Sequence, residues 1–577
     1  MVNFAHGSFF MLGAYVAWSV FQWMPRDPLP FAAGILLAAL AVGAIGAGVE
    51  MLLLRRIYRA RELFQLLATF GVVLVVQEAA LYVWGAADHT LPRPRWLRQG
   101  FDILGQRFPA WDLYLVFVGP LVLALLWLLF TRTRFGTLVR AATEDREMVA
   151  ALGVDQKRLF TLVFALGAAL AGLGGAIALP SGSANLQMDL AVIADAFVVV
   201  VVGGLGSVPG AFLAALLIAE IQAFGIVLVP KATLVLTFLV MALVLALRPH
   251  GLLGRPQAAE RGRDPAPLLR PTPRWLAAAG IGLVVLLALL PLLAGVYLLS
   301  LATEIACLTL LAASLHFMMG PGGIVSFGHA AFFGLGAYAA ALAAHWLGAP
   351  MLAGLAAAPL LAGAAGVLFG ALVVRLSGVY LAMLTLAFAQ IVWATSFQWV
   401  EFTGGDNGIL GVWPDAWAQP KPVFWWLALA LAAGGVWVLR RMIFSPFGYA
   451  LRATRDSPLR AAAIGLDVAR VQWAAFSVAA LFAGLGGGLY AYAKGSVFPT
   501  YVAIPKSVDA LMMVLLGGVQ TVAGPVVGAA AWMGLSDLLV RFTDLWRLAL
   551  GLTIILLVLL FPHGLVGAAQ RRLLHDA

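Results

Sequence analysis

The pentapeptide Ala-Gly-Leu-Gly-Gly occurs twice in this chain of 577 residues, at 171–175 and again, letter for letter, at 483–487. Both copies close a longer stretch in which polar residues recur at constant spacing. The matched pairs are Arg140 with Arg452, Gly153 with Gly465, Asp155 with Asp467, and Arg158 with Arg470. Chance similarity between two apolar segments would not keep polar residues in register, so the chain contains an internal repeat.

Two further signatures repeat in the same order. Residues 3–7, Asn-Phe-Ala-His-Gly, match residues 326–330, Ser-Phe-Gly-His-Ala, and Gly203-Gly204 matches Gly517-Gly518. Two homologous halves, 1–254 and 275–577, are therefore joined end to end. The second half has two apolar spans before its histidine signature, whereas the first begins at that signature. We expect that the first half lacks its first transmembrane helix, through a start codon placed too far downstream or a fragmentary chain, with genuine loss as the alternative.

The composition determines the environment of the chain. Hydrophobic residues make up 63% and charged residues only 11%, and the mean hydropathy is +0.98. One water-soluble core cannot shield so much apolar surface, so the chain is expected to be a polytopic membrane protein. Apolar runs give eight candidate spans in the first half and ten in the second, with the shorter, glycine-bounded runs read as re-entrant or broken. The predicted fold is an all-α transmembrane helix bundle of two pseudo-symmetric halves.

The formal charge of +10 could suggest a nucleic-acid partner, but the arginines gather in short loops between apolar spans. The positive-inside rule explains that distribution and places the loops at 132–158 and 440–470 in the cytoplasm. One loop does not follow this rule. Residues 87–110 carry four arginines, although counting the spans places this loop on the extracytoplasmic side of the membrane. Residues 255–274 combine five arginines with five prolines and are predicted to be a cytoplasmic linker.

The two arginine-rich loops carry the strongest functional prediction. Each is expected to form a short polar helix between two spans, ended by a capping glycine. Small apolar faces, Val149-Ala150 with Leu152 and Ala462-Ala463-Ile464, lie beside charges that offer directional contacts to a soluble partner. A single such loop would be an ordinary solvated loop, but its duplication favours docking. The candidate residues are Arg140, Glu144, Gly153, Asp155, Arg158, Arg452, Asp456, Gly465, Asp467 and Arg470.

A second set of candidates lies within the membrane. The paired glycines predict broken helices that expose backbone groups to a substrate, and close helix packing explains them equally well. The two histidines could line a path, although an interhelical hydrogen bond is the favoured interpretation. Glu78, Glu220 and Glu304 are unrepeated carboxylates in apolar runs and are candidates by default. The translocation-path candidates are Asn3, His6, Gly7, Gly203, Gly204, Ser326, His329, Gly517 and Gly518.

Catalytic and metal-binding motifs are not found in the sequence. The single cysteine, Cys307, lies in an apolar run, and none of the five lysines follows a glycine, so no phosphate-binding loop is encoded. We expect a chain without catalytic residues, metal or cofactor of its own.

The signatures at 3–7, 140–145 (Arg-Ala-(x)₃-Asp) and 171–175 resemble those of permease subunits of branched-chain amino acid ABC importers. The first half resembles the LivH type. The second half resembles the LivM type through residues 322–333, 380–387 and 403–408. The resemblance covers nearly the whole chain outside the linker.

The resemblance implies a multi-pass subunit of a bacterial inner membrane that transports branched-chain or related small amino acids by alternating access. It also implies two cytoplasmic ATPase subunits, which would hold ATP and Mg²⁺, and an extracytoplasmic binding protein. The polar loops would then be coupling helices. Urea and short-amide importers share these signatures and remain an alternative. A secondary transporter would also show internal repeats, but it would not need duplicated polar loops.

Overall fold

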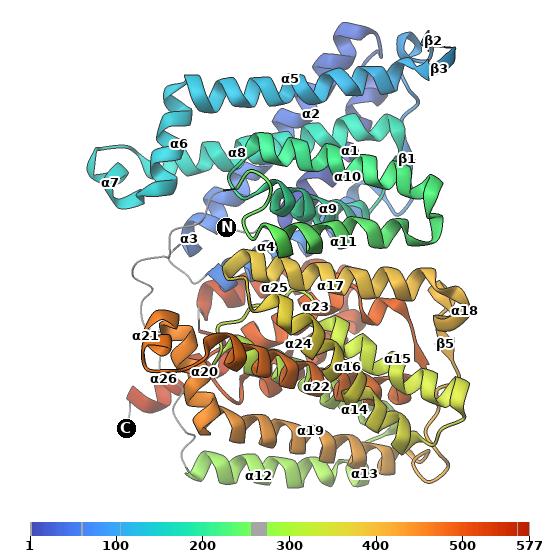
Figure 1. Cartoon of the computed structure of the whole chain (residues 1–577), viewed down its shortest axis with the longest axis vertical. Helices are drawn as coiled ribbons and strands as arrows, with labels where there is room; N and C mark the ends of the chain where they lie inside the picture. The colour runs from blue at the N-terminus through green and yellow to red at the C-terminus, as the bar shows by residue number, and fades with distance from the viewer. Residues whose placement is uncertain (1–2, 59–61, 104, 255–273, 562, 576–577) are drawn as a thin grey trace. The chain divides into compact units, whose positions relative to one another are not determined.

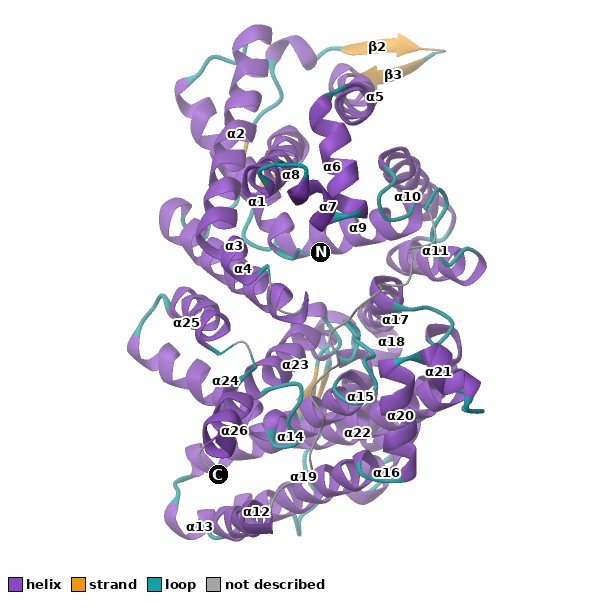
Figure 2. Ribbon diagram, turned by 90° about the vertical axis from the view of Figure 1, so that its left-hand side faces the viewer, coloured by secondary structure: helices purple, strands orange, loops and turns teal. Residues whose placement is uncertain are grey.

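The computed structural model describes residues 3–58, 62–103, 105–254, 274–561 and 563–575. All of the predicted linker except its last residue lies outside the described residues. Helices dominate the described chain, and the few strands form three two-stranded pairs (Figure 2). Among the described residues, 15 helices are long and apolar enough to cross a membrane. The polytopic helical bundle predicted from the sequence is confirmed.

The first half begins with helices that match the expected spans closely. Proline at the first position of α2 and the Thr133 cap before α6 mark two of the starts. Its elements are α1 (Ala5–Trp23), α2 (Pro28–Val49), a π-turn η1 (Glu50–Leu54), α3 (Arg55–Ile57), α4 (Glu62–Trp84), β1 (His89–Thr90), η2 (Arg95–Leu97), β2 (Gly100–Ile103), β3 (Gln106–Pro109), α5 (Ala110–Arg132), α6 (Arg134–Glu144), α7 (Arg146–Ala151), α8 (Gln156–Ala178), η3 (Leu179–Ser181), β4 (Ser183–Ala184), α9 (Met188–Gly203), α10 (Val208–Leu228), η4 (Pro230–Ala232) and α11 (Thr233–Leu247).

The second half repeats this order after three additional helices at its start, α12, α13 and α14. Its elements are α12 (Arg274–Ala288), α13 (Leu290–Leu293), α14 (Val296–Met319), α15 (Ala330–Leu347), α16 (Met351–Val373), α17 (Gly378–Gln398), α18 (Val400–Thr403), η5 (Gly405–Asn407), β5 (Ile409–Leu410), α19 (Lys421–Ile443), α20 (Pro446–Asp456), α21 (Pro458–Ala463), α22 (Val468–Lys494), β6 (Ser496–Val497), η6 (Pro499–Tyr501), α23 (Ile504–Gly517), α24 (Gly524–Phe542), α25 (Trp546–Leu560) and α26 (Leu565–His575). Corresponding elements of the halves are α1 and α15, α2 and α16, α4 and α17, and α8 and α22.

The repeated pentapeptide lies where the central helix of each half crosses its neighbours. In the first half α8 packs between α1 and α2, and in the second α22 packs between α15 and α16 (Figure 1). A Cβ on Gly13 would lie 2.5 Å from Gly172 Cα, and a Cβ on Gly336 would lie 2.5 Å from Gly484 Cα. The glycines of the repeat therefore allow the backbones of neighbouring helices to touch, as small residues do in membrane bundles.

The chain divides in space into two compact units that are not the same segments as the sequence halves. One unit contains residues Met1–Leu213 and Leu538–Pro562, and the other contains Ala214–Asp537 and His563–Ala577. Helix α25 of the second half thus packs on α4 of the first, where a Cβ on Gly551 would lie 2.8 Å from the Gly71 oxygen. In the other unit, α11 of the first half packs along α17 of the second. Each unit is completed by the last long helix of the opposite half.

The short strands tie together loops at one end of each half. Strand β1 pairs with β4, so the arginine-bearing loop at 87–110 lies at the same end as the end of α8. Helix α8 begins at the loop 132–158, and this pairing supports the assignment of 87–110 to the opposite side of the membrane. In the second half, β5 pairs with β6 in the same way.

Candidate functional site

Each arginine-rich loop contains two short helices and not the single helix predicted from the sequence. In the first loop α6 ends at Glu144 and α7 begins at Arg146, and in the second α20 ends at Asp456 and α21 begins at Pro458. Asp145 and Ser457 have extended backbones, and their side chains accept hydrogen bonds from Met148 N (2.9 Å) and Arg460 N (3.4 Å). An N-cap side chain in mid-loop starts a new helix, which is why the single-helix prediction is wrong.

The glycines predicted to end these helices do so. Gly153 and Gly465 have φ angles of +83° and +88°, in the left-handed region that favours glycine. The N–H groups of Val154 and Leu466 bond back to carbonyls five residues earlier, at 3.4 and 3.1 Å. This is the Schellman arrangement of a helix C-terminus, and it is the same in both halves.

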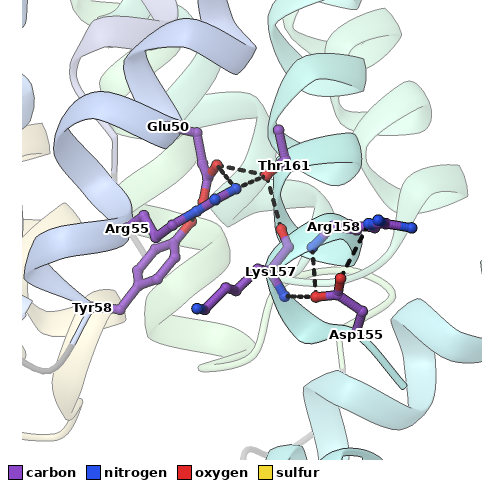
Figure 3. A network of polar contacts seen from close by, with 7 residues as sticks. All are labelled: Glu50, Arg55, Tyr58, Asp155, Lys157, Arg158 and Thr161. Carbon is purple, nitrogen blue, oxygen red and sulfur yellow. Dashed lines mark hydrogen bonds and ion pairs between the residues drawn. The ribbon is translucent and has the colours of Figure 1, made fainter. Parts of the chain in front are cut away.

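The aspartate and arginine that recur at the same spacing at the start of each central helix form a capping unit. Asp155 accepts from the N–H groups of Lys157 (3.0 Å) and Arg158 (3.2 Å), and its other oxygen pairs with Arg158 Nε at 3.2 Å (Figure 3). Asp467 and Arg470 form the same pair at 3.0 Å. The arginine side chains are more than four-fifths exposed, so the ion pairs themselves add little stability. The capping unit fixes where α8 and α22 leave the loops.

Arg140 and Arg452 bind carbonyl groups at the end of the preceding helix. Arg140 Nη1 donates to the Phe130 oxygen, and Arg452 Nη2 donates to the Ile443 oxygen at 2.7 Å. Arg452 is only 8% exposed, whereas Arg140 is exposed. Arginine near a helix C-terminus satisfies carbonyls that have no partner within the helix. Both residues hold the loop against the end of a membrane span.

The two acidic candidates occupy matching places but differ in their contacts. Glu144 and Asp456 are the last residues of α6 and α20, and Asp456 pairs with Arg455 at 2.8 Å. Arg455 also donates to the Gly320 oxygen at 2.6 Å. The second loop is thereby attached to the turn between α14 and α15.

The outer face of each loop presents a large apolar side chain to water. Val149 is buried in a small cluster with Ala142 and Leu159, and this cluster holds α7 against α6 and α8. On the opposite side, Leu152 and Ile464 occupy equivalent positions and are each 75% exposed. The loops thus have a packed inner face and an apolar outer tip.

Among the membrane candidates, the first residues of the histidine signature form a turn. Asn3 Oδ1 accepts from Ala5 N at 3.0 Å, and Ser326 Oγ accepts from Gly328 N at 3.3 Å. His329 is fully buried and forms a 2.8 Å hydrogen bond with Ser314 of α14, the interhelical contact favoured by the sequence.

The first-half partners of these residues pack more simply. His6 is half-buried, and its Cε1 lies 3.9 Å from where a Cβ on Gly167 would be. A Cβ on Gly7 would lie 3.0 Å from the carbonyl carbon of Asp189, so Gly7 permits close packing of α1 on α9.

The paired glycines both end a helix and permit close packing, and exposure of their backbone groups to a substrate stays a prediction. Helix α9 ends at Gly203 and α23 ends at Gly517, and the next residues, Gly204 and Gly518, have φ angles of +100° and +119°. A Cβ on Gly203 would lie 2.5 Å from the carbonyl carbon of Gly210, and one on Gly517 would lie 2.9 Å from Gly524 Cα.

Two buried carboxylates were not among the residues singled out from the sequence. Asp189 is 1% exposed and accepts from Gln77 Nε2 at 3.0 Å and Ser8 Oγ at 3.2 Å. Glu50 is fully buried at the end of α2 (Figure 3). Their sequence signal is a carboxylate within an apolar run, the same signal that marked Glu304. The structure pairs Glu304 with Lys494 at 2.7 Å.

Known proteins resemble both halves of the chain. The family model described as branched-chain amino acid transport system / permease component matches residues 1–245 and again 297–561. The high-affinity permease protein BraD of Pseudomonas aeruginosa is 31% identical over 270 residues, which cover 44% of this chain and 87% of BraD.

The Escherichia coli permease proteins show the same pattern. LivM is 30% identical over 302 residues, covering 47% of this chain and 71% of LivM, and LivH is 28% identical over 267 residues, covering 44% and 87%. No solved structure matches.

Proposed function

The chain belongs to the family of branched-chain amino acid transport permease components, as a fusion of LivH-type and LivM-type halves, and from this premise we propose how it works. One chain supplies both permease halves of an importer in a bacterial inner membrane. Two cytoplasmic ATPase subunits bind ATP and Mg²⁺ and drive it, and an extracytoplasmic binding protein delivers the substrate. The chain itself catalyses no reaction and binds no cofactor.

The observation that carries this proposal is the matched exposure of Leu152 and Ile464. Each stands at the tip of a rigid, capped helix and leaves three quarters of its surface in water. Single exposed leucines are common on proteins. Two exposed apolar residues at equivalent positions of a repeated polar loop support an interaction surface. An apolar centre within a polar rim is the common arrangement of a protein interface. Two such tips fit two ATPase subunits, one for each loop.

The exchange of helices between the halves supports a single chain as the working unit. Helix α25 completes the unit built on the first half, and α11 completes the unit built on the second. Each half therefore needs the other to cover its α4 or α17. We expect one chain to associate with two ATPase subunits, without a second copy of the permease.

The proposed transport mechanism depends on the connection between the exposed tips, Leu152 and Ile464, and the membrane spans. The capped starts of α8 and α22 link α7 and α21 directly to the central helix of each half. Closure of the ATPase subunits would pull the two tips together and change the packing around these central helices, which gives alternating access. The proposed substrates are branched-chain or related small amino acids, in agreement with the names of the relatives.

The docking proposal is tested by replacing the two tips with charge. Leu152→Asp and Ile464→Asp remove the apolar anchors without altering the buried cluster. Loss of an interface anchor costs about 2 kcal/mol or more, or roughly a 30-fold weaker association. Co-purification of tagged permease with its co-encoded ATPase subunits measures this.

Leu253→Asp is the matched control, because Leu253 is 49% exposed but lies outside both loops. Retention of both ATPase subunits by Leu152→Asp and Ile464→Asp would refute the assignment of the tips. Loss in the Leu253→Asp control as well would show a general effect of added charge.

A further inference from the structure

A buried polar network lies at the end of α2 in the first half. The carboxylate of Glu50 is fully buried and has three partners (Figure 3). Its Oε2 accepts from Thr161 Oγ1 at 2.6 Å and from Arg55 Nη2 at 3.2 Å, and its Oε1 accepts from Tyr58 Oη at 2.9 Å. Thr161 belongs to α8, so the network joins the end of α2 to the central helix.

The backbone is shaped to place these groups. Residues Glu50–Leu54 form a π-turn, in which the Arg55 N–H bonds to the Glu50 oxygen. A π-turn inserts an extra residue into the helix and is frequently found at functional sites. The segment ends at Tyr58, where Gln65 Nε2 of α4 donates to the carbonyl oxygens of Ile57 and Tyr58 at 3.3 Å. Both ends of the segment are held by neighbouring helices.

The network continues to the tip-bearing helix α7. The guanidinium of Arg146, the first residue of α7, lies over the ring of Phe160 at 4.5 Å and over the ring of Tyr58 at 5.5 Å. Burial and the hydrogen bond to Glu50 raise the pKa of Tyr58, which keeps the phenol protonated as a donor. A continuous set of contacts therefore runs from α7 through Tyr58 to Glu50.

The register of the repeat identifies the equivalent positions in the second half. Gly46 of α2 packs on Ala168 of α8, and a Cβ on Gly366 of α16 would lie 2.5 Å from the Cβ of Ala480. Ala168 and Ala480 are partners in the repeat, so Gly46 corresponds to Gly366. By the same offset, Glu50 corresponds to Gly370.

The second half replaces the network with an aromatic ring. Thr161 corresponds to Trp473, and a Cβ on Gly370 would lie 2.9 Å from Trp473 Cδ1. The indole thus fills the space that the Glu50 side chain occupies in the first half, and it donates to the Val367 oxygen at 2.8 Å. Tyr58, Arg146 and Phe160 are replaced as well, by Gly378, Pro458 and Gln472, whereas Arg55 is retained as Arg375.

This comparison shows that the fold does not require a buried charge at the end of α2. A glycine and an indole fill the same position in the other half, and buried ion pairs contribute little net stability compared with apolar packing. The network is therefore better explained by the contacts it makes between α7 and α2. The second loop is attached elsewhere, through Arg455 to the Gly320 carbonyl.

We propose that Glu50 is a positioning residue of the transport cycle, which with Tyr58 and Arg146 transmits movement of α7 to α2 in the first half only. The inference rests on the proposed function, because it assigns α7 to an ATPase contact. The two coupling loops then act on different parts of the chain. The first loop moves the C-terminal end of α2, and the second loop moves the turn before α15. Breaking the network uncouples ATP hydrolysis from transport while the ATPase subunits stay bound.

The test measures leucine uptake and ATP hydrolysis together, in proteoliposomes that contain the full chain, its ATPase subunits and its binding protein. The variants are Glu50→Gln and Arg55→Gln, and the matched control is Arg375→Gln, which makes the same change at the repeat partner of Arg55. Leucine transported per ATP hydrolysed should fall about fivefold or more in both variants, within the range that mutations along coupling networks produce. The control should keep the wild-type ratio.

Amounts of bound ATPase separate coupling from folding. These amounts and the hydrolysis rate should stay near wild type in both variants, which a purely structural role would not predict. If either variant lowers the yield of folded chain, the ratio is measured in Tyr58→Phe in its place. This substitution removes only the hydrogen bond from Tyr58 to Glu50 and leaves the ring beneath Arg146. An unchanged ratio in Tyr58→Phe, or equal ratios in Arg55→Gln and Arg375→Gln, would overturn the inference. A wild-type chain without ATP-dependent uptake would instead refute the proposed function.

Discussion

Gly487, the last residue of the second pentapeptide, offers a sensitive test of the packing. A Cβ at this position would lie 2.7 Å from the carbonyl carbon of Phe333 and 3.1 Å from Ala337 N, and closer still to the Phe333 oxygen. An ordinary contact of a Cβ begins at 3.4 Å. Gly487→Ala therefore cannot be accommodated unless α22 and α15 move apart, because all three obstructing atoms belong to the backbone.

The size of the effect follows from this geometry. Overpacking of a close contact costs about 1–3 kcal/mol. Gly434→Ala on α19 is the matched control, since nothing lies within 4 Å of its Cβ position. Alanine in a helix there is expected to stabilise by about 0.5–1 kcal/mol. The free energies of unfolding of the two variants should therefore differ by about 1.5–4 kcal/mol, with changes in opposite directions.

Thermal unfolding in detergent, followed by size-exclusion chromatography of the surviving protein, measures the difference. Unfolding of membrane proteins is often irreversible, so midpoints should be compared at one heating rate. We expect a lower midpoint for Gly487→Ala and an unchanged or higher midpoint for Gly434→Ala. Equal midpoints would show that the two helices do not cross as closely as described, and would refute the explanation given for the repeated pentapeptide.

Four further substitutions test the loops. Asp467→Ala removes the N-cap of α22 and should lower the stability of that helix end by about 1 kcal/mol. Amide hydrogen exchange in the first turn of α22 should then be faster. Unchanged exchange would argue against the cap. Arg452→Ala should lower the thermal midpoint more than Arg140→Ala, because only Arg452 is buried together with its hydrogen bonds. Hydrogen bonds to charged groups contribute about 1.5–3 kcal/mol to stability. A larger drop in midpoint for Arg140→Ala would contradict this. Gly465→Ala forces a φ of +88° on alanine, which costs about 1–2 kcal/mol. Less ATPase should therefore co-purify with this variant. An undiminished amount of ATPase would show that the end of α21 is not needed for docking.

Much of the fold could be predicted from the sequence because the repeat keeps chemically demanding residues in register. Gly153 and Gly465 are needed where a helix ends in the left-handed region, and Asp155 and Asp467 are needed where the next helix begins. Local rules of this kind depend on a few neighbouring residues. Length and composition likewise determine that the spans are helical.

The parts that could not be predicted depend on contacts distant in sequence. Glu50 meets Thr161 across 111 residues, and Asp189 meets Gln77 across 112. The exchange of α11 and α25 between the units leaves no local pattern either. The break at Asp145 is a different case, because an aspartate directly before a short helical run is a recognisable helix N-cap.

The most direct test of the central claim is uptake of labelled leucine into proteoliposomes that contain the full chain with the ATPase subunits and the binding protein proposed as its partners. Labelled urea, measured in parallel, tests the alternative substrate class. The account predicts leucine uptake that requires ATP and the binding protein and that is abolished when Leu152→Asp and Ile464→Asp are combined. Leucine uptake that proceeds equally without ATP would contradict it.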